Sequence, residues 1–407
     1  MIIKNDTSGL PVWERPDLFL PVPSQTWGYV SAKDRKSHIV AGEDELKLEL
    51  RKDHDENIHL VWMPGMTNME VPEAIPRLFQ QVKESRVRSH LLTLVDESGR
   101  IKWGLMIFSF YGFYSVYQSF TSAPAFGLME HLLAWVKSSN FTLGLLLFVM
   151  FAAFPWYESR KRWKEVKEWT EEGMREAGRL VRFETWLAGQ KIVVTRGLLG
   201  LLGLIYALQF FSGSKATAAA LLSDRLDERW RLLSAPLMHG HPLHFMMNAL
   251  GLLYLGRRIE ALARWPHVIL VFLFSAWIGG ECSILRLASL RVPTAALGAS
   301  GGLMGMLGFL LVFETLHRRL VPRSARARLI TAMVSTAIIG IVGIKFIDNA
   351  AHAGGLVAGM IYAATVFPKS DSVIRPKVMV QERYLAYAAS AFLLYGAWKV
   401  VESIFFI

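Results

Sequence analysis

The sequence has only one cysteine, Cys282, and few charged residues for its length. Charged side chains make up 19% of the 407 residues, hydrophobic ones make up 52%, and the mean hydropathy is +0.30. Soluble domains carry about a quarter of their residues as charges, so much of this surface is expected to lie outside water. One cysteine cannot form an internal disulfide, and no Cys-x-x-Cys or Cys/His cluster is present to hold a metal. The composition excludes an ordinary water-soluble enzyme, and no metal or other cofactor is expected.

A cleaved secretory signal is also not expected, because MIIKNDTSGL has no basic stretch followed by an apolar one. Residues 1–102 instead predict a small soluble α+β domain on the cytoplasmic side. In this region, the alternation around Leu46, Leu48 and Leu50 predicts a half-buried strand, IHLVWM and HLLTLV are strand-like runs, and a helix is expected over 72–88. Its histidines have no ligand spacing, so no chemistry is assigned to it.

From Trp103 onward, uncharged runs recur at about the length of a membrane-spanning helix. The segment at 242–256 is short and is expected to begin below the membrane surface or beside shielded irregular backbone. The sequence therefore predicts an all-α polytopic membrane protein behind the α+β domain. Nine crossings are expected, at 103–121, 141–157, 193–211, 242–256, 266–283, 298–316, 329–347, 351–367 and 383–405.

The charge distribution predicts the orientation. The formal net charge is +11, but residues 1–102 are net −2 and residues 103–407 are net +13, so the basic excess lies among the apolar segments. With the N-terminus inside, the inner loops hold 21 Lys and Arg and the outer loops hold 7. This bias follows the positive-inside rule, so no nucleic-acid partner is expected. The sequence therefore predicts an integral multi-pass membrane protein whose N-terminus is cytoplasmic.

Three polar motifs interrupt the apolar segments. Gly298-Ala-Ser300-Gly301 opens one segment, where a serine at a helix N-terminus suits a nucleophile beside an oxyanion. The alternative is a helix-packing stripe of small residues with an incidental serine. In a later segment, His352 shares one helix face with Gly355 and Gly359. An intramembrane histidine is a functional candidate, although a hydrogen-bonded helix contact is the alternative.

The third motif contains three histidines, His239, His241 and His244. Pro242 suits the first turn of a helix, so His244 and Asn248, at i and i+4, offer two donors to one point. The alternatives are metal binding and interfacial snorkelling, and the metal is disfavoured because no clustered carboxylate or cysteine completes the set. In the predicted topology all three motifs meet at the outer ends of parallel segments, where His352 can act as base for Ser300.

Together these motifs resemble those of rhomboid intramembrane serine proteases, over residues 191–370. The matching elements are Trp230-Arg231, His239, His244-Phe-Met-Met-Asn248, Gly298-Ala-Ser300-Gly301, and His352-Ala-Gly-Gly355 followed by Gly359. Where several family members have a tyrosine four residues after the serine, this chain has Met304.

The resemblance implies a six-helix core and a Ser300–His352 dyad. It also implies an oxyanion hole of the Ser300 N–H, His244 and Asn248, with His239 in the surrounding network and Trp230 and Arg231 supporting an outer loop. The implied substrates are single-pass transmembrane proteins in the lipid bilayer, and the implied location is a bacterial inner membrane. The chain is thus divided into the domain at 1–102, two helices and a basic amphipathic connector at 103–190, the core at 191–370, and an extra helix at 371–407.

The sequence favours a protease over two other functions. A non-catalytic rhomboid-like protein that binds or escorts transmembrane clients would typically lack the serine or the histidine, and both are present. A transporter would show interrupted helices in corresponding halves, which the sequence does not have. Two intramembrane carboxylates have plainer explanations: Glu281 lies near an outer end, and Glu314 is expected to pair with Arg318 at i+4. The sequence does not predict the oligomeric state.

Overall fold

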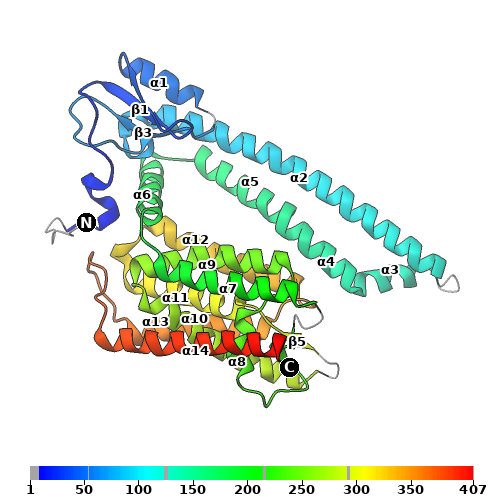
Figure 1. Cartoon of the computed structure of the whole chain (residues 1–407). Helices are drawn as coiled ribbons and strands as arrows, with labels where there is room; N and C mark the ends of the chain where they lie inside the picture. Colours follow the sequence, from blue (N-terminus) through cyan, green and yellow to red (C-terminus); the bar gives the residue numbers. More distant parts are fainter. Residues whose placement is uncertain (1–8, 54, 123–126, 214–216, 291–293, 407) are drawn as a thin grey trace. The chain divides into compact units, whose positions relative to one another are not determined.

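The computed structural model describes residues 9–53, 55–122, 127–213, 217–290 and 294–406. By its internal contacts the chain divides into two compact units. Trp13–Phe183 and Val334–Ile347 form one, which we call the N-terminal unit; Glu184–Met333 and Asp348–Ile407, with Met1–Val12, form the other, which we call the helical unit. Figure 1 shows the elements of both.

A small antiparallel sheet begins the N-terminal unit. Its strands are β1 (Trp27–Ser31), β2 (Ser37–Val40) and β3 (Ile58–Trp62), in the order β2-β1-β3. Strand β3 confirms the strand expected at IHLVWM. Short 3-10 turns precede the sheet at η1 (Val12–Glu14) and η2 (Pro16–Leu18) and follow it along the chain at η3 (Pro72–Ala74) and η4 (Pro76–Leu78).

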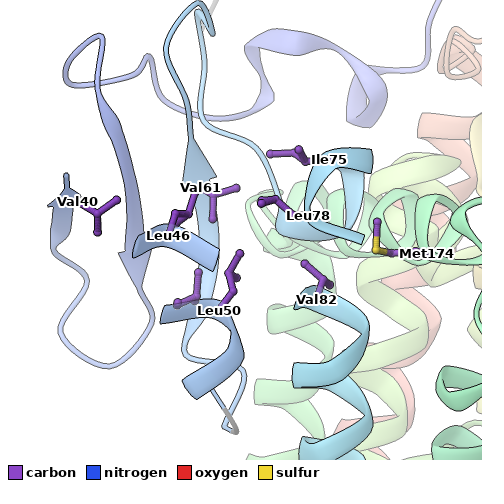
Figure 2. Packing of buried hydrophobic residues seen from close by; sticks show 9 residues of the cluster. Val40, Leu46, Leu50, Val61, Ile75, Leu78, Val82 and Met174 are labelled. Atoms are coloured by element: carbon purple, nitrogen blue, oxygen red, sulfur yellow. The ribbon is translucent and has the colours of Figure 1, made fainter. Parts of the chain in front are cut away.

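The strand expected around Leu46, Leu48 and Leu50 is wrong, because these residues lie in helix α1 (Glu43–Lys52). Leu46 and Leu50 are both buried, whereas Leu48 is half exposed. Burial at i and i+4 is the helical pattern, and alternating leucines satisfy it as well as they satisfy a strand. Acidic residues in the first turn and basic ones in the last also favour the helix. Figure 2 shows Leu46 and Leu50 packed with Val61, Val82 and Met174 in the core of the unit.

The strand-like run at HLLTLV is also wrong, since it lies inside the 44-residue helix α2 (Phe79–Ser122). The same helix contains the expected segment 103–121 and most of the helix expected over 72–88, whose first residues form η3 and η4 instead. Helix α2 packs along α4 (Ser139–Phe148) and α5 (Phe154–Lys167), which a π-helical turn (Val149–Ala153) joins; α3 (Leu128–Lys137) precedes them. Helix α6 (Glu171–Ala188) follows.

The helical unit contains the segments that carry the three polar motifs. A two-stranded ladder of β4 (Leu221–Leu222) and β5 (Ala295–Ala296) joins two of its loops. Its helices are α7 (Val193–Phe211), α8 (Arg231–Ser234), α9 (Pro242–Leu262), α10 (Pro266–Ala288), α11 (Ser300–Leu316), α13 (Asn349–Val366) and α14 (Val380–Phe405), with short turns η7 (Ala235–Leu237) and η8 (Arg318–Leu320); α12 (Arg323–Val342) crosses the division between the units.

Glycines hold the centre of the helical unit together. A Cβ added at Gly355 in α13 would lie 2.9 Å from the Gly301 carbonyl carbon in α11, and one at Gly359 would lie 2.6 Å from that of Gly305. Helix α10 packs against both helices, and Gly279 faces the Ala351 carbonyl. Backbones approach this closely only where side chains are missing. The two expected glycine stripes therefore form a single interface.

Within the described residues, five helical stretches are long and apolar enough to cross a membrane. They are Ser139–Lys167, Val193–Phe211, Pro266–Ala288, Arg323–Val342 and Val380–Phe405, and α11 is a shorter apolar helix. The protein is therefore a mostly helical, multi-pass membrane protein with a small sheet near its N-terminus, as the sequence predicts. The nine crossings, their orientation and the domain boundaries stay predictions.

Candidate active site

The loop before Ser300 is held in a conformation that favours glycine. Gly298 has φ +126°, and its N–H donates to the carbonyl of Ala235 at 2.9 Å. Helix α11 then begins at Ser300, with Ala299 already in the helical conformation. The serine therefore occupies the positive end of a 17-residue helix, where the first N–H groups have no partner within the helix. This is a favourable position for negative charge that develops next to the serine.

Two side chains of α9 lie against this loop. A Cβ added at Gly298 would be 2.6 Å from Cε1 of His244 and 3.6 Å from Nδ2 of Asn248. Helix α9 begins immediately before them, where Nδ1 of His241 accepts from the His244 N–H at 3.3 Å and Pro242 occupies the first turn. The expectation that His244 and Asn248 share a helix face thus agrees with α9, and that face meets the Gly298–Ser300 turn.

Asn248 has an unused donor. Its side chain is 6% exposed, and its amide Nδ2 has no hydrogen-bond partner among the described residues. A buried amide without a partner costs about 1–3 kcal/mol. Groups of this kind are rare in native proteins and call for an explanation, of which a catalytic role is one. The amide is available for an acceptor that arrives with a substrate.

His352 is brought to the same level by the glycine interface of α11 and α13. A Cβ on Gly301, the residue after Ser300, would lie 3.5 Å from the carbonyl of Ala351, the residue before His352. One end of the helical unit therefore contains all four candidate residues, Ser300, His352, His244 and Asn248.

Asp348 is the carboxylate closest in sequence to His352, and it has other partners. It caps α13 by accepting from the Ala351 N–H at 3.2 Å, and it pairs with Nε of Arg286 at 3.0 Å. The Ser283 hydroxyl also donates to it. In the part of the chain that the structure describes, no hydrogen bond joins a carboxylate to the His352 imidazole. Asp348 therefore fixes the start of α13 against α10.

His239 lies behind the site. Its side chain is buried, its ring lies 5.2 Å from that of His244, and both ring nitrogens lack a hydrogen-bond partner among the described residues. Its backbone is held by Gln209 in α7, which accepts from the His239 N–H at 3.0 Å and donates to its carbonyl at 3.3 Å. Gln209 was not predicted from the sequence, although an uncharged polar residue near the end of an apolar helix is a signal for such a role.

Arg231 organises the loop before α8. Its buried guanidinium donates to the carbonyls of Ala218 and Ala220, at 2.7 and 2.8 Å, and pairs with Glu228 at 2.8 Å. It also lies over the ring of Trp230, as does Lys399 of α14. These contacts hold the loop that leads into β4, and β4 pairs with the strand just before Gly298.

One expected pairing is wrong. Glu314 forms a bidentate ion pair with Arg258 of α9, at 2.5 and 2.9 Å, rather than with Arg318 of its own helix. Both side chains are fully buried, and a buried carboxylate needs a partner that is itself inside the protein. Glu281, near the end of α10, pairs with the exposed Arg229 at 2.6 Å. No group of three His, Cys, Asp or Glu side chains among the described residues is arranged to hold a metal ion.

Comparisons with known proteins place this site in a recognised domain. Residues 226–369 match the family model described as "Rhomboid domain". RHOMBOID-like protein 4 of Arabidopsis thaliana is 33% identical over 136 residues, a third of each chain. Rhomboid protease GluP of Bacillus subtilis (strain 168) is 29% identical over 170 residues, which are 42% of this chain and 32% of that protein. RHOMBOID-like protein 6, mitochondrial, of Arabidopsis thaliana is 31% identical over 134 residues, 33% of this chain and 42% of that one.

The matches thus span about a third to two fifths of these relatives' length. The fold and the apolar helices define an integral, multi-pass membrane protein. Residues 226–369 therefore form a domain of the rhomboid family.

Proposed function

We propose that the protein is an intramembrane serine endopeptidase that cleaves transmembrane segments of single-pass proteins near the outer face of a bacterial inner membrane. The observation that carries the proposal is the contact of His244 and Asn248 with the Gly298–Ser300 turn, because it supplies side-chain donors beside a serine at a helix N-terminus. A relative supports the same activity, because GluP of Bacillus subtilis is named a rhomboid protease.

The proposed chemistry begins with His352 taking the proton of the Ser300 hydroxyl while its Oγ attacks the scissile carbonyl. Negative charge then develops on the carbonyl oxygen, next to the Ser300 N–H, His244 and the free amide of Asn248. Collapse of the tetrahedral intermediate passes the proton from His352 to the leaving amine. Water then hydrolyses the acyl-enzyme, again with His352 as base.

The test is cleavage of a model single-pass substrate by the purified full chain, with Ser300→Ala beside the wild type. Alanine fits the start of α11, so the variant should fold normally and show no cleavage. A matched control is Ser390→Ala in α14, whose hydroxyl donates to the Ala386 carbonyl within its own helix. Undiminished cleavage by Ser300→Ala would refute the assignment. An inactive wild type that still retains the transmembrane segment would favour a client-binding protein instead.

A further inference from the structure

An arginine occupies a backbone position that normally belongs to glycine. Helix α9 ends at Leu262, and Arg264 follows with φ +87°. The N–H groups of Ala263 and Arg264 both donate to the carbonyl of Ile259, at 2.8 and 3.1 Å. Helices commonly end on a residue in this left-handed region, and glycine is favoured there because it has no Cβ. Ending the helix would therefore favour glycine at position 264. The arginine found there indicates a separate role for its side chain.

A second arginine lies at the same corner. Arg375, in the loop between α13 and α14, donates through Nη1 to the carbonyl of Ala261 at 3.0 Å. Arg264 donates in the opposite direction, through Nε to the carbonyl of Pro376 at 3.3 Å. The two side chains therefore cross between the end of α9 and the loop. Each guanidinium has five N–H donors, so most remain available for another acceptor.

The two positive charges have no counter-charge in the described chain. Neither arginine forms an ion pair with any described carboxylate, Asp371 of the same loop included, and Glu260 of α9 and Glu382 of α14 are engaged elsewhere. Glu260 accepts from the N–H groups of Val194 and Thr195, and Glu382 accepts from the Met379 N–H at 2.7 Å. Burial, together with the charge of Arg264, lowers the pKa of Arg375 to about 10. An anion bound between the arginines would relieve this repulsion.

The pair lies at the end of the helical unit away from the candidate active site. Helix α9 has 21 residues and begins beside His244. At 1.5 Å per residue it spans about 30 Å, which is the thickness of the hydrocarbon core. Trp265 packs on Tyr387 of α14 with ring centroids 5.6 Å apart, and Trp186 lies 5.6 Å from the Arg375 guanidinium. Tryptophan and tyrosine are enriched at membrane interfaces, so we expect this corner to lie at headgroup level.

We propose that Arg264 and Arg375 bind the phosphate of an anionic lipid headgroup at this interface. Arginine suits phosphate because its planar fork makes paired, charge-assisted hydrogen bonds. Ile374, beside Arg375, is 66% exposed and is positioned to contact the acyl region of the same lipid. The site would tie the loop between α13 and α14 to the end of α9 without taking part in peptide cleavage.

The experiment measures thermal unfolding of the delipidated full chain in a non-ionic detergent, by tryptophan fluorescence. Phosphatidylglycerol, phosphatidylcholine and inorganic phosphate are titrated separately. The variants are Arg264→Gly and Arg375→Gln, with Lys377→Gln as the control that removes the same charge from an exposed position of the same loop. Native mass spectrometry counts the phosphatidylglycerol molecules that each protein retains.

We expect phosphatidylglycerol to raise the unfolding temperature of the wild type and of Lys377→Gln. The half-saturating lipid concentration should rise about ten- to a hundred-fold in Arg264→Gly and Arg375→Gln, since each loses charge-assisted hydrogen bonds. Without lipid, Arg264→Gly should unfold at the wild-type temperature or above, because glycine suits the backbone. Three results would overturn the proposal: equal lipid responses in all four proteins, an equal response to inorganic phosphate, or a less stable Arg264→Gly without lipid.

Discussion

At the scale of single residues, the buried amide of Asn248 distinguishes a catalytic role from a structural one. A structural asparagine would be hydrogen-bonded in the resting protein, whereas this Nδ2 has no partner in the described chain. Removing it therefore takes away no native hydrogen bond and relieves a desolvation cost. Stability and activity should respond to its loss in opposite directions.

For Asn248→Ala we expect turnover to fall about ten- to a thousand-fold, the range for one oxyanion donor. The unfolding temperature should stay at or above that of the wild type. Cleavage rates at saturating substrate and thermal unfolding are measured on the same preparation. Unchanged turnover with a raised KM would make Asn248 a substrate contact, and a large loss of stability would make it structural.

Ser300 and His352 should behave as one catalytic unit. His352→Ala should be about as inactive as Ser300→Ala, and the double variant hardly slower than either, because residues that act together are not additive. Single-turnover cleavage rates for the three variants give the comparison. A double variant slower by the product of both single effects would mean that the two residues act independently.

The buried Arg258–Glu314 ion pair should stabilise the fold. Sequence spacing alone predicted Arg318 as the partner of Glu314. Both side chains are 0% exposed, so Glu314→Gln leaves a buried guanidinium without its counter-charge. Breaking one partner of a buried pair costs about 3–5 kcal/mol. Glu281→Gln is the matched control, because its pair with Arg229 is exposed and should contribute about 0–1 kcal/mol. Denaturant unfolding measures both variants. Equal losses in the free energy of unfolding would contradict a stabilising role of the buried pair.

At the scale of elements, the interface between α11 and α13 sets the level of the serine against that of the histidine. Gly355→Ala would push a methyl group into the Gly301 backbone, so we expect both a lower unfolding temperature and a displaced His352 with little cleavage. Gly200→Ala in α7 is the control, since its Cβ would meet nothing within 4 Å. That change should be neutral or stabilising by about 1 kcal/mol. Similar behaviour of the two variants would refute the close approach.

The type of an element could be predicted from the sequence where its apolar residues follow only the helical period. It could not be predicted where the helical period and the strand period both fit. The long apolar runs and the glycine faces of α11 and α13 follow a helical period over many residues, so their type was clear. Leu46, Leu48 and Leu50 span only five residues, and a helix with Leu48 outward fits them as well as a strand. Partners across elements, such as Arg258 for Glu314 or Gln209 for His239, depend on packing that no local spacing encodes.

At the scale of the whole molecule, the site's position along its helices determines where a substrate would be cut. Ser300, His244 and His352 lie in the first turns of α11, α9 and α13, which have 17, 21 and 18 residues. The proposed chemistry therefore occurs near one membrane interface, and water for deacylation enters from that side. With the N-terminus inside, as the loop charges predict, that side is the outer one.

A transmembrane substrate must unwind before it reacts, because its helix satisfies every backbone hydrogen bond in the membrane. We therefore expect faster cleavage of segments with glycine or proline near the outer end, and slower cleavage when those residues become leucine. Mass spectrometry of the products maps the cut, and matched substrates carry the same leucine substitutions near the inner end as controls. A cut near the inner interface would contradict the orientation. Equal rates for all the substrates would contradict the unwinding step, since leucine strengthens the helix that must open.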